Sequence, residues 1–420
     1  MSTQDRPFPR YGMTLPVIAS ILGNIIEYYD FVIYASFSTS IGQTFFPAGL
    51  ALSQIALTLA TFGFTLLARP VGAVVLGICT DRRGRTFTMI LCIALMAIGS
   101  LLITLTPGYQ SIGMAAPLLI VTARLLHGFS LGGEFGSATS FLIEQAPGHE
   151  ARAASWQAIG QIVASLVAAI VTLGLTLLLP AQGFDSYGFR IAAGLGALAG
   201  LLALVLRFRL LRTRPAPPVV KAVPASPFLR RENLLRTLAV MGAVALGSGI
   251  TYLGIYMPHY ARLHFHVAAN LAYASALLTY GGQLVFTPLR WKLADHFDRT
   301  RSIRPMLLSC AVLFCLPWPM FRLVSIWPES ILVMPLLFNV VGLLYFAALD
   351  GFIGILFPDR LRGRGLTIGY SFGVVLFGGL APLTNAALMS WSGTELAPAF
   401  YLGLTALISA TAIFAARRLL

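Results

Sequence analysis

The sequence predicts an all-α membrane protein with twelve transmembrane helices in two six-helix bundles. Three observations carry this prediction. The chain has 420 residues, of which 57% are hydrophobic and 10% charged, whereas a soluble protein carries roughly 25% charged residues. Apolar runs of about 20 residues or more, the length that crosses a bilayer, recur along it. Its basic residues also fall mostly on one side of these runs, which orients a membrane protein.

With the N-terminus placed inside, most of the 29 Lys and Arg residues lie at cytoplasmic ends and loops. Both termini are then cytoplasmic. The net charge of +14 therefore reflects topology, and we expect no nucleic-acid partner. The predicted spans are residues 15–46, 53–80, 86–106, 114–144, 153–179, 188–208, 237–260, 267–290, 304–324, 331–356, 365–389 and 395–416.

The first span contains two acids in an otherwise apolar run. At about 100° per residue, Glu27 and Asp30 share one helix face with Asn24 and Tyr34, and Tyr29 points away. Ionised acids inside a membrane helix are expensive and mark functional sites. We expect this polar stripe to face protein or a water-filled cavity.

A central linker and internal repetition divide the chain. Residues 211–236 are basic and Pro-rich, which predicts a cytoplasmic tether between bundles at 1–210 and 237–420. Asp81 and Arg85 after the second span recur as Asp295 and Arg299 after the eighth, an offset of 214 residues. Such a constant offset is typical of a duplicated half.

Several classes of function have no support in the sequence. It contains no phosphate-binding loop that ends in Gly-Lys-Ser/Thr and no catalytic motif, so we expect neither an enzyme nor an ATP-driven pump. We expect no cofactor and no metal. The four cysteines lack ligand spacing and are predicted to be small buried hydrophobic residues: Cys79, Cys92, Cys310 and Cys315.

The first cytoplasmic hairpin is either a solvated basic loop or a charge latch that closes the cytoplasmic side. Its pattern Gly-x-x-x-Asp-Arg-x-Gly-Arg resembles the signature loop of the major facilitator superfamily, and this favours the latch. The predicted cytoplasmic gate comprises Gly77, Asp81, Arg82, Gly84, Arg85, Asp295 and Arg299. The second copy has Trp291 and Asp298 where the pattern has glycines, so we expect a weaker latch there.

Further blocks in both halves resemble the metabolite–proton symporters of that superfamily, most closely the citrate-carrying branch. They are Gly23–Phe31, Arg69–Ala73, Arg124–Ser130, Gly188–Ile191 and Phe377–Pro382. The resemblance implies a proton-coupled carrier of organic acid anions or zwitterionic osmolytes in a bacterial inner membrane. It departs from the pattern at Asp350, an acid about one turn earlier than expected.

Arg124 is the leading candidate for binding the substrate. It lies near the middle of the fourth span, and its planar guanidinium can hold a carboxylate through two hydrogen bonds. It could instead pair structurally with Glu27 or Asp30. Arg69 in the second span has the same two alternatives.

Proton coupling needs a carboxylate whose pKa responds to solvent access and to a neighbouring cation. Glu27 and Asp30 are the leading candidates together with Arg124, and which of the two acids carries the proton stays open. Glu134 is a further candidate. Both acids could instead serve only as structural partners of buried arginines.

Other polar residues on helix faces complete the predicted substrate site. The alternative for each residue is a purely structural role, in which its polar group makes hydrogen bonds inside a helix bundle. They are Asn24, Tyr28, Tyr34, Gln157, Gln161, Tyr256, His259 and Tyr370.

The sequence therefore predicts a proton symporter of small carboxylates such as citrate, working by alternating access as a monomer in the bilayer. An osmolyte–proton symporter for proline or betaine is the main alternative. A membrane sensor that binds ligand without moving it is a third hypothesis.

Overall fold

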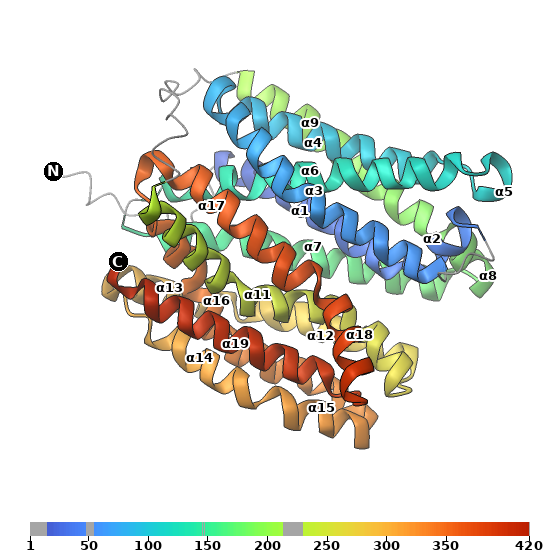
Figure 1. The fold of residues 1–420 in the computed structure, drawn as a ribbon. Helices are drawn as coiled ribbons and strands as arrows, with labels where there is room; N and C mark the ends of the chain where they lie inside the picture. Colours follow the sequence, from blue (N-terminus) through green and yellow to red (C-terminus); the bar gives the residue numbers. More distant parts are fainter. Residues whose placement is uncertain (1–14, 48–53, 145, 147, 213–229, 420) are drawn as a thin grey trace. The chain divides into compact units, whose positions relative to one another are not determined.

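The computed structural model describes residues 15–47, 54–144, 146, 148–212 and 230–419, which are helical almost throughout and contain no strand (Figure 1). Each of the twelve predicted spans coincides with one helix or with consecutive helices. In the first half these are α1 (Leu15–Ser36) with α2 (Ser38–Phe45), α3 (Gln54–Arg83), α4 (Arg85–Leu105), α6 (Ala115–Glu144), α7 (Glu150–Leu178) and α9 (Phe189–Arg212).

The second half follows the same order. Its helices are α11 (Arg231–His264), α12 (Ala269–Val285) with α13 (Thr287–Thr300), α14 (Arg304–Cys315) with α15 (Pro317–Ile326), α16 (Met334–Ile355), α17 (Asp359–Val374) with α18 (Ala381–Ser392), and α19 (Ala397–Ala416). Short segments complete the described chain: α5 (Tyr109–Ile112), α8 (Ala181–Gly183), the π-helices Phe184–Gly188 and Val375–Gly379, and the 3-10 helices Pro328–Leu332 and Arg417–Leu419.

Proline marks three of the breaks between consecutive helices. Pro288 and Pro382 lie in the first turns of α13 and α18, and Pro317 begins α15. Proline lacks the backbone N–H that a helix interior needs, but the first turn does not need it. Each predicted span of this kind therefore becomes two helices in sequence.

Eight described helical segments are long and apolar enough to cross a membrane by length and composition. The other predicted spans lie on α1 with α2, α3, α12 with α13, and α17 with α18. Shorter apolar helical stretches, Gly63–Cys79 and Gly365–Gly379, occur in two of them.

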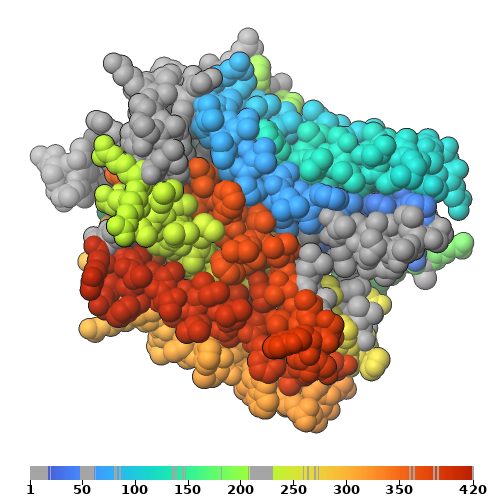
Figure 2. Space-filling model, viewed as in Figure 1, coloured from blue at the N-terminus to red at the C-terminus, as the bar shows by residue number. Residues whose placement is uncertain are grey.

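The described helices form two compact units. The N-terminal unit contains the described residues within 15–138 and 163–212, and in it α9 packs along α4 and α1. The C-terminal unit contains the described residues within 139–162 and 230–419, and in it α11 packs against α19 and α17. Figure 2 shows α11 in yellow-green beside α19 in dark red. The division at residues 210 and 237 stays a prediction, and most of the linker lies outside the described residues.

The cysteine prediction is correct for two of four residues. Cys92 and Cys310 are buried, Cys79 is half-buried, and Cys315 at the end of α14 is exposed. Because the surface of a membrane helix can face lipid, an apolar sequence context does not by itself place a cysteine in the protein interior.

Candidate functional site

The acidic stripe of α1 is buried inside the N-terminal unit, as predicted. Asn24, Glu27 and Asp30 are each at most 4% exposed. Asp30 Oδ2 accepts a short hydrogen bond from Ser100 Oγ on α4. On the other side, a Cβ added at Gly196 of α9 would lie 3.2 Å from Asp30 Cγ, so α9 approaches this carboxylate without an intervening side chain. The carboxylate thus lies where α1, α4 and α9 meet.

Arg124 lies on α6 and is 1% exposed. Its guanidinium carbon is 3.5 Å from the centroid of the Tyr34 ring, in cation–π geometry. The Tyr34 hydroxyl in turn is 2.5 Å from Thr61 Oγ1 on α3. Arg124 Nε and Nη1 have no hydrogen-bond partner in the described part of the chain. A buried cation with unused, coplanar donors suits a carboxylate ligand.

Glycines bring α3 and α6 into close contact and so position the second arginine. A Cβ at Gly72 would lie 2.8 Å from Phe129 Cα, and one at Gly128 would lie 2.9 Å from Thr65 Cα. Neither helix could approach so closely with side chains at these positions. Arg69 is buried on α3, and Glu134 is buried further along α6.

Two residues of this site were not among the predicted ones. His127 Nε2 on α6 is 3.2 Å from Ser100 Oγ and 3.2 Å from the Met96 carbonyl oxygen on α4. His127 is 1% exposed and follows Arg124 by three positions, which places both side chains on one face of α6. That spacing was a usable signal for His127, but nothing local in the sequence singles out Ser100.

The remaining predicted substrate residues lie in both units. Tyr28 is buried in the N-terminal unit. In the C-terminal unit Gln157 is buried, whereas Gln161, Tyr256 and Tyr370 are half-buried. The Tyr256 ring centroid is 5.9 Å from that of Tyr260. The His259 side chain lies outside the described residues. The contacts of these residues with a substrate stay predictions.

The first hairpin is only partly described. Gly84 separates α3 from α4 with φ +86°, a backbone conformation that favours glycine. Gly77 is half-buried on α3. The side chains of Asp81, Arg82 and Arg85 lie outside the described residues.

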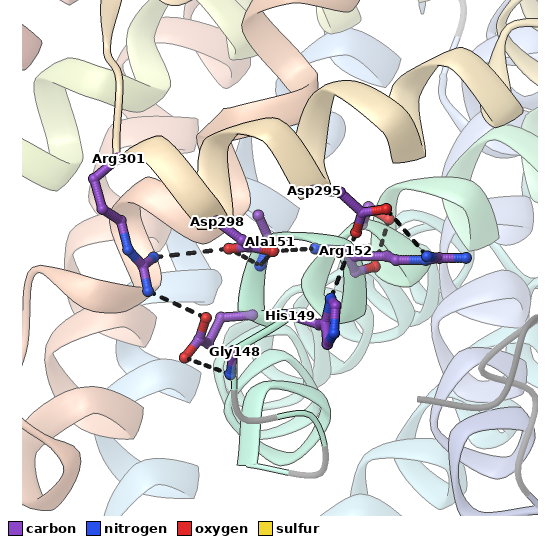
Figure 3. Close-up of polar contacts among 9 residues, drawn as sticks. Gly148, His149, Ala151, Arg152, Asp295, Asp298 and Arg301 are labelled. Atoms are coloured by element: carbon purple, nitrogen blue, oxygen red, sulfur yellow. Dashed lines mark hydrogen bonds and ion pairs between the residues drawn. The ribbon is translucent and has the colours of Figure 1, made fainter. Parts of the chain in front are cut away.

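The second hairpin contacts the N-terminus of α7 within the C-terminal unit (Figure 3). Asp295 Oδ2 accepts a hydrogen bond of 3.1 Å from Arg152 Nη1, and His149 Nδ1 is 3.6 Å from Asp295 Oδ1. Arg299 is exposed. Of the two predicted gate residues on α13, Asp295 therefore has a defined partner in this cluster.

Trp291 and Asp298, which were expected to weaken this hairpin, make direct contacts instead. Asp298 accepts hydrogen bonds of 3.0 and 3.1 Å from the Ala151 N–H and one of 3.4 Å from the Arg152 N–H, so it caps the first turn of α7. The Trp291 ring lies 5.2 Å from the Trp156 ring, with the Arg152 guanidinium 5.5 Å from it. Arg301 pairs with Glu150 at 3.2 Å. Contact residues thus occupy the positions where the pattern has glycines.

Burial raises the pKa of Asp298 from 3.8 to about 6; the backbone donors of Ala151 and Arg152 oppose the shift, as does Arg301, and Glu150 adds to it. Because the folded pKa is the higher one, Asp298 contributes stability below about pH 4, and this contribution is lost as the pH rises through 6. Asn at this position cannot ionise.

We therefore expect the melting temperature of the wild-type protein, relative to that of Asp298→Asn, to fall by roughly 2 °C between acidic and neutral pH. Thermal unfolding of both purified proteins across this range measures it. Glu232→Gln removes an exposed carboxylate of α11 and should keep the wild-type slope. Equal slopes for wild type and Asp298→Asn would contradict the burial argument.

The unusual acid of the tenth predicted span also has a partner. Asp350 Oδ2 on α16 is 3.3 Å from Arg290 Nη2 on α13, and both side chains are buried. The same Nη2 donates to the Phe346 carbonyl at 3.0 Å. This pair cross-links α13 and α16 inside the C-terminal unit.

No group of three or more His, Cys, Asp and Glu side chains that could hold a metal ion occurs among the described residues. The polar chemistry of the N-terminal unit is instead that of buried carboxylates, guanidinium groups, hydroxyls and an imidazole. These groups can bind an anion and exchange a proton.

Comparison with known proteins agrees with this chemistry. Residues 12–382 match the family model described as Major Facilitator Superfamily. The chain is 31% identical over 419 residues to a citrate-proton symporter of Salmonella typhi, covering 97% of this chain and 95% of the relative. It is 30% identical over 408 residues to a glycine betaine/proline/ectoine/pipecolic acid transporter, OusA, of Dickeya dadantii, covering 93% and 81%.

A solved structure shares the fold. The proton:xylose symporter XylE bound to 6-bromo-6-deoxy-D-glucose superposes with a TM-score of 0.77 at 16% identity, covering 95% of this chain and 94% of that one. The predicted all-α membrane fold and the resemblance to citrate–proton symporters are confirmed. The chain is a multi-pass membrane transporter, and it belongs to the major facilitator superfamily.

Proposed function

We propose that this protein is a proton-coupled symporter of small organic acid anions, with a di- or tricarboxylate such as citrate as its substrate. One observation carries the proposal. Arg124 is buried, its guanidinium stacks on the Tyr34 ring, and two of its nitrogens have no hydrogen-bond partner among the described residues. A substrate carboxylate would supply the missing negative charge and acceptors.

The proton is carried by Asp30 in this proposal. Its carboxylate is buried, lies close enough to Arg124 for the charges to interact, and has a hydroxyl donor in Ser100. The guanidinium of Arg124 can then pair with either the carboxylate of Asp30 or a carboxylate of the substrate. Protonation of Asp30 removes the competing charge, so proton binding and anion binding favour each other.

Alternating access would expose this site to each side of the membrane in turn, with both termini cytoplasmic. The cluster of Asp295, Asp298 and Arg152 at the start of α7 is suited to be a cytoplasmic latch, because it joins α13 to the connection after α6 by charge and by helix capping.

The osmolyte symporter is the second candidate, since the chain is nearly as similar to the betaine and proline transporter OusA as to the citrate–proton symporter. A zwitterion also presents a carboxylate to Arg124, but its cationic group needs a partner such as an aromatic face or an acid. One feature favours the acid: Arg124 Nε and Nη1 have no hydrogen-bond partner among the described residues.

Uptake into proteoliposomes tests the proposal. Citrate, 2-oxoglutarate, shikimate, proline and betaine would be offered as labelled substrates at one acidic and one neutral external pH. We expect accumulation of at least one acid, faster at acidic external pH. Accumulation of the zwitterions alone would replace the acid by the osmolyte proposal, and binding without flux would indicate a sensor.

A further inference from the structure

The hydrogen positions around Ser100 follow from the acceptors that surround it. The Met96 carbonyl can only accept, and His127 Nε2 lies 3.2 Å from it, so Nε2 carries a hydrogen. The same Nε2–H lies 3.2 Å from Ser100 Oγ. Ser100 has one hydroxyl hydrogen and two acceptors within reach, Asp30 Oδ2 and the Met96 carbonyl oxygen at 3.1 Å. It can satisfy only one of them at a time.

The protonation state of Asp30 decides which acceptor Ser100 serves. When Asp30 is ionised, the Ser100 hydroxyl donates to its carboxylate and His127 Nε2–H supplies a donor to Ser100 Oγ. When Asp30 takes up a proton, its own O–H donates to Ser100 Oγ, and the Ser100 hydrogen turns to the Met96 carbonyl. One proton is added to the carboxylate and the hydrogen bonds are redirected, but no covalent bond between heavy atoms is made or broken.

Several charged or titratable groups face this trio. Arg124 on α6 acts electrostatically on both Asp30 and His127. Tyr29 and Tyr34 come from α1, where Tyr29 donates to the Ala192 carbonyl of α9 at 2.9 Å. Further charged groups of the same unit are Glu27 on α1, Arg69 on α3, and Arg190 on α9, which donates to the Thr104 carbonyl at 2.8 Å.

We propose that Ser100 and His127 are positioning residues that set the pH at which Asp30 exchanges its proton. This exchange changes the hydrogen bonds that Ser100 makes where α4 contacts α6. The inference rests on the proposed function, in which Asp30 carries the proton. His127 acts through Ser100: its N–H lies within reach of both the Ser100 oxygen and the Met96 carbonyl, so it competes for that carbonyl and favours donation of the Ser100 hydroxyl to Asp30.

Infrared difference spectroscopy of the purified protein in nanodiscs tests the relay without any substrate. The protonated carboxyl band of Asp30 is followed against pH and is identified by its loss in Asp30→Asn. Ser100→Ala removes a hydrogen bond to the charged form, so the midpoint should move to higher pH by about one to two units. Ser100→Thr keeps a hydroxyl and should restore the wild-type midpoint.

The His127 variants separate a positioning role from a packing role. His127→Leu should move the midpoint in the same direction by a smaller amount, whereas His127→Gln keeps an N–H donor and should stay near the wild type. Because His127 acts through Ser100, the double variant Ser100→Ala/His127→Leu should shift no further than Ser100→Ala alone.

Ser130→Ala is the matched control, because Ser130 Oγ also joins α6 to α4, donating to the Cys92 carbonyl at 2.9 Å, and it has no contact with Asp30. It should leave the midpoint unchanged. An unchanged midpoint in Ser100→Ala, or additive shifts in the double variant, would overturn the relay. If Ser100→Ala does not fold, an unshifted His127→Leu would overturn it equally.

The same experiment distinguishes the relay from the proposed function. If Asp30→Asn removes no carboxyl band, Asp30 is not the titrating acid, and the proposed proton site fails together with the relay. If the Asp30 band is present but does not respond to Ser100→Ala, only the relay fails.

Discussion

Replacing Arg124 by lysine is expected to raise the KM for citrate uptake by about 100-fold or more, since a buried charged hydrogen-bond partner is worth several kcal/mol. Lysine keeps the positive charge but lacks the planar fork that can hold a carboxylate through two parallel bonds. It also loses the stacking of the guanidinium over Tyr34, 3.5 Å from the ring centroid. Initial uptake rates in proteoliposomes as a function of citrate concentration measure the effect.

Arg190→Lys is the matched control for this experiment. Arg190 lies in the same unit, stacks near the Phe45 and Phe189 rings, and donates to the Thr104 carbonyl, but it lies near the outer end of its predicted span. Its replacement should change KM by less than about threefold if the guanidinium serves only packing. A wild-type KM in Arg124→Lys would show that the carboxylate is bound elsewhere.

Replacing Asp30 by asparagine is expected to abolish proton-driven accumulation while leaving exchange of citrate across the membrane. Asparagine resembles the protonated acid in shape, and it can still hydrogen-bond to Ser100. It cannot release a proton, so the carrier would still cycle with substrate but without the pH gradient as its driving force. Accumulation and counterflow, measured on the same vesicles, separate these two activities.

Glu27→Gln is the comparison for Asp30→Asn, because Glu27 lies one turn earlier on the same face of α1 and is equally buried. We expect Glu27→Gln to keep at least part of the accumulation. If both variants accumulate citrate as the wild type does, the proton is carried by another acid, with Glu134 next in order.

The fold could be predicted because membrane helices leave a strong record in the sequence. Runs of about 20 apolar residues mark spans, and the placement of basic residues orients them. Residues such as Pro317 then break a predicted span into two helices without removing it. The cost of burying charge also makes Asp30 and Arg124 stand out in the sequence, since few alternatives explain such residues in an apolar span.

The partners of these residues could not be predicted in the same way. Ser100 is an ordinary polar residue in its own helix, and only the packing of α1, α4 and α6 brings it to Asp30 and to His127. The contacts of Asp298 could not be predicted for a different reason. Comparison with the signature pattern shows that the second hairpin lacks its glycines. It does not show that the carboxylate of Asp298 reaches the N–H groups in the first turn of α7.

Proton movement coupled to citrate is the most direct test of the central claim. Sealed proteoliposomes in weakly buffered medium would receive a pulse of citrate while the external pH is recorded. The account predicts alkalinisation of the medium on addition of citrate, which is abolished in Asp30→Asn and, at the same citrate concentration, in Arg124→Lys. Citrate uptake by the wild type with no accompanying change in external pH would contradict it.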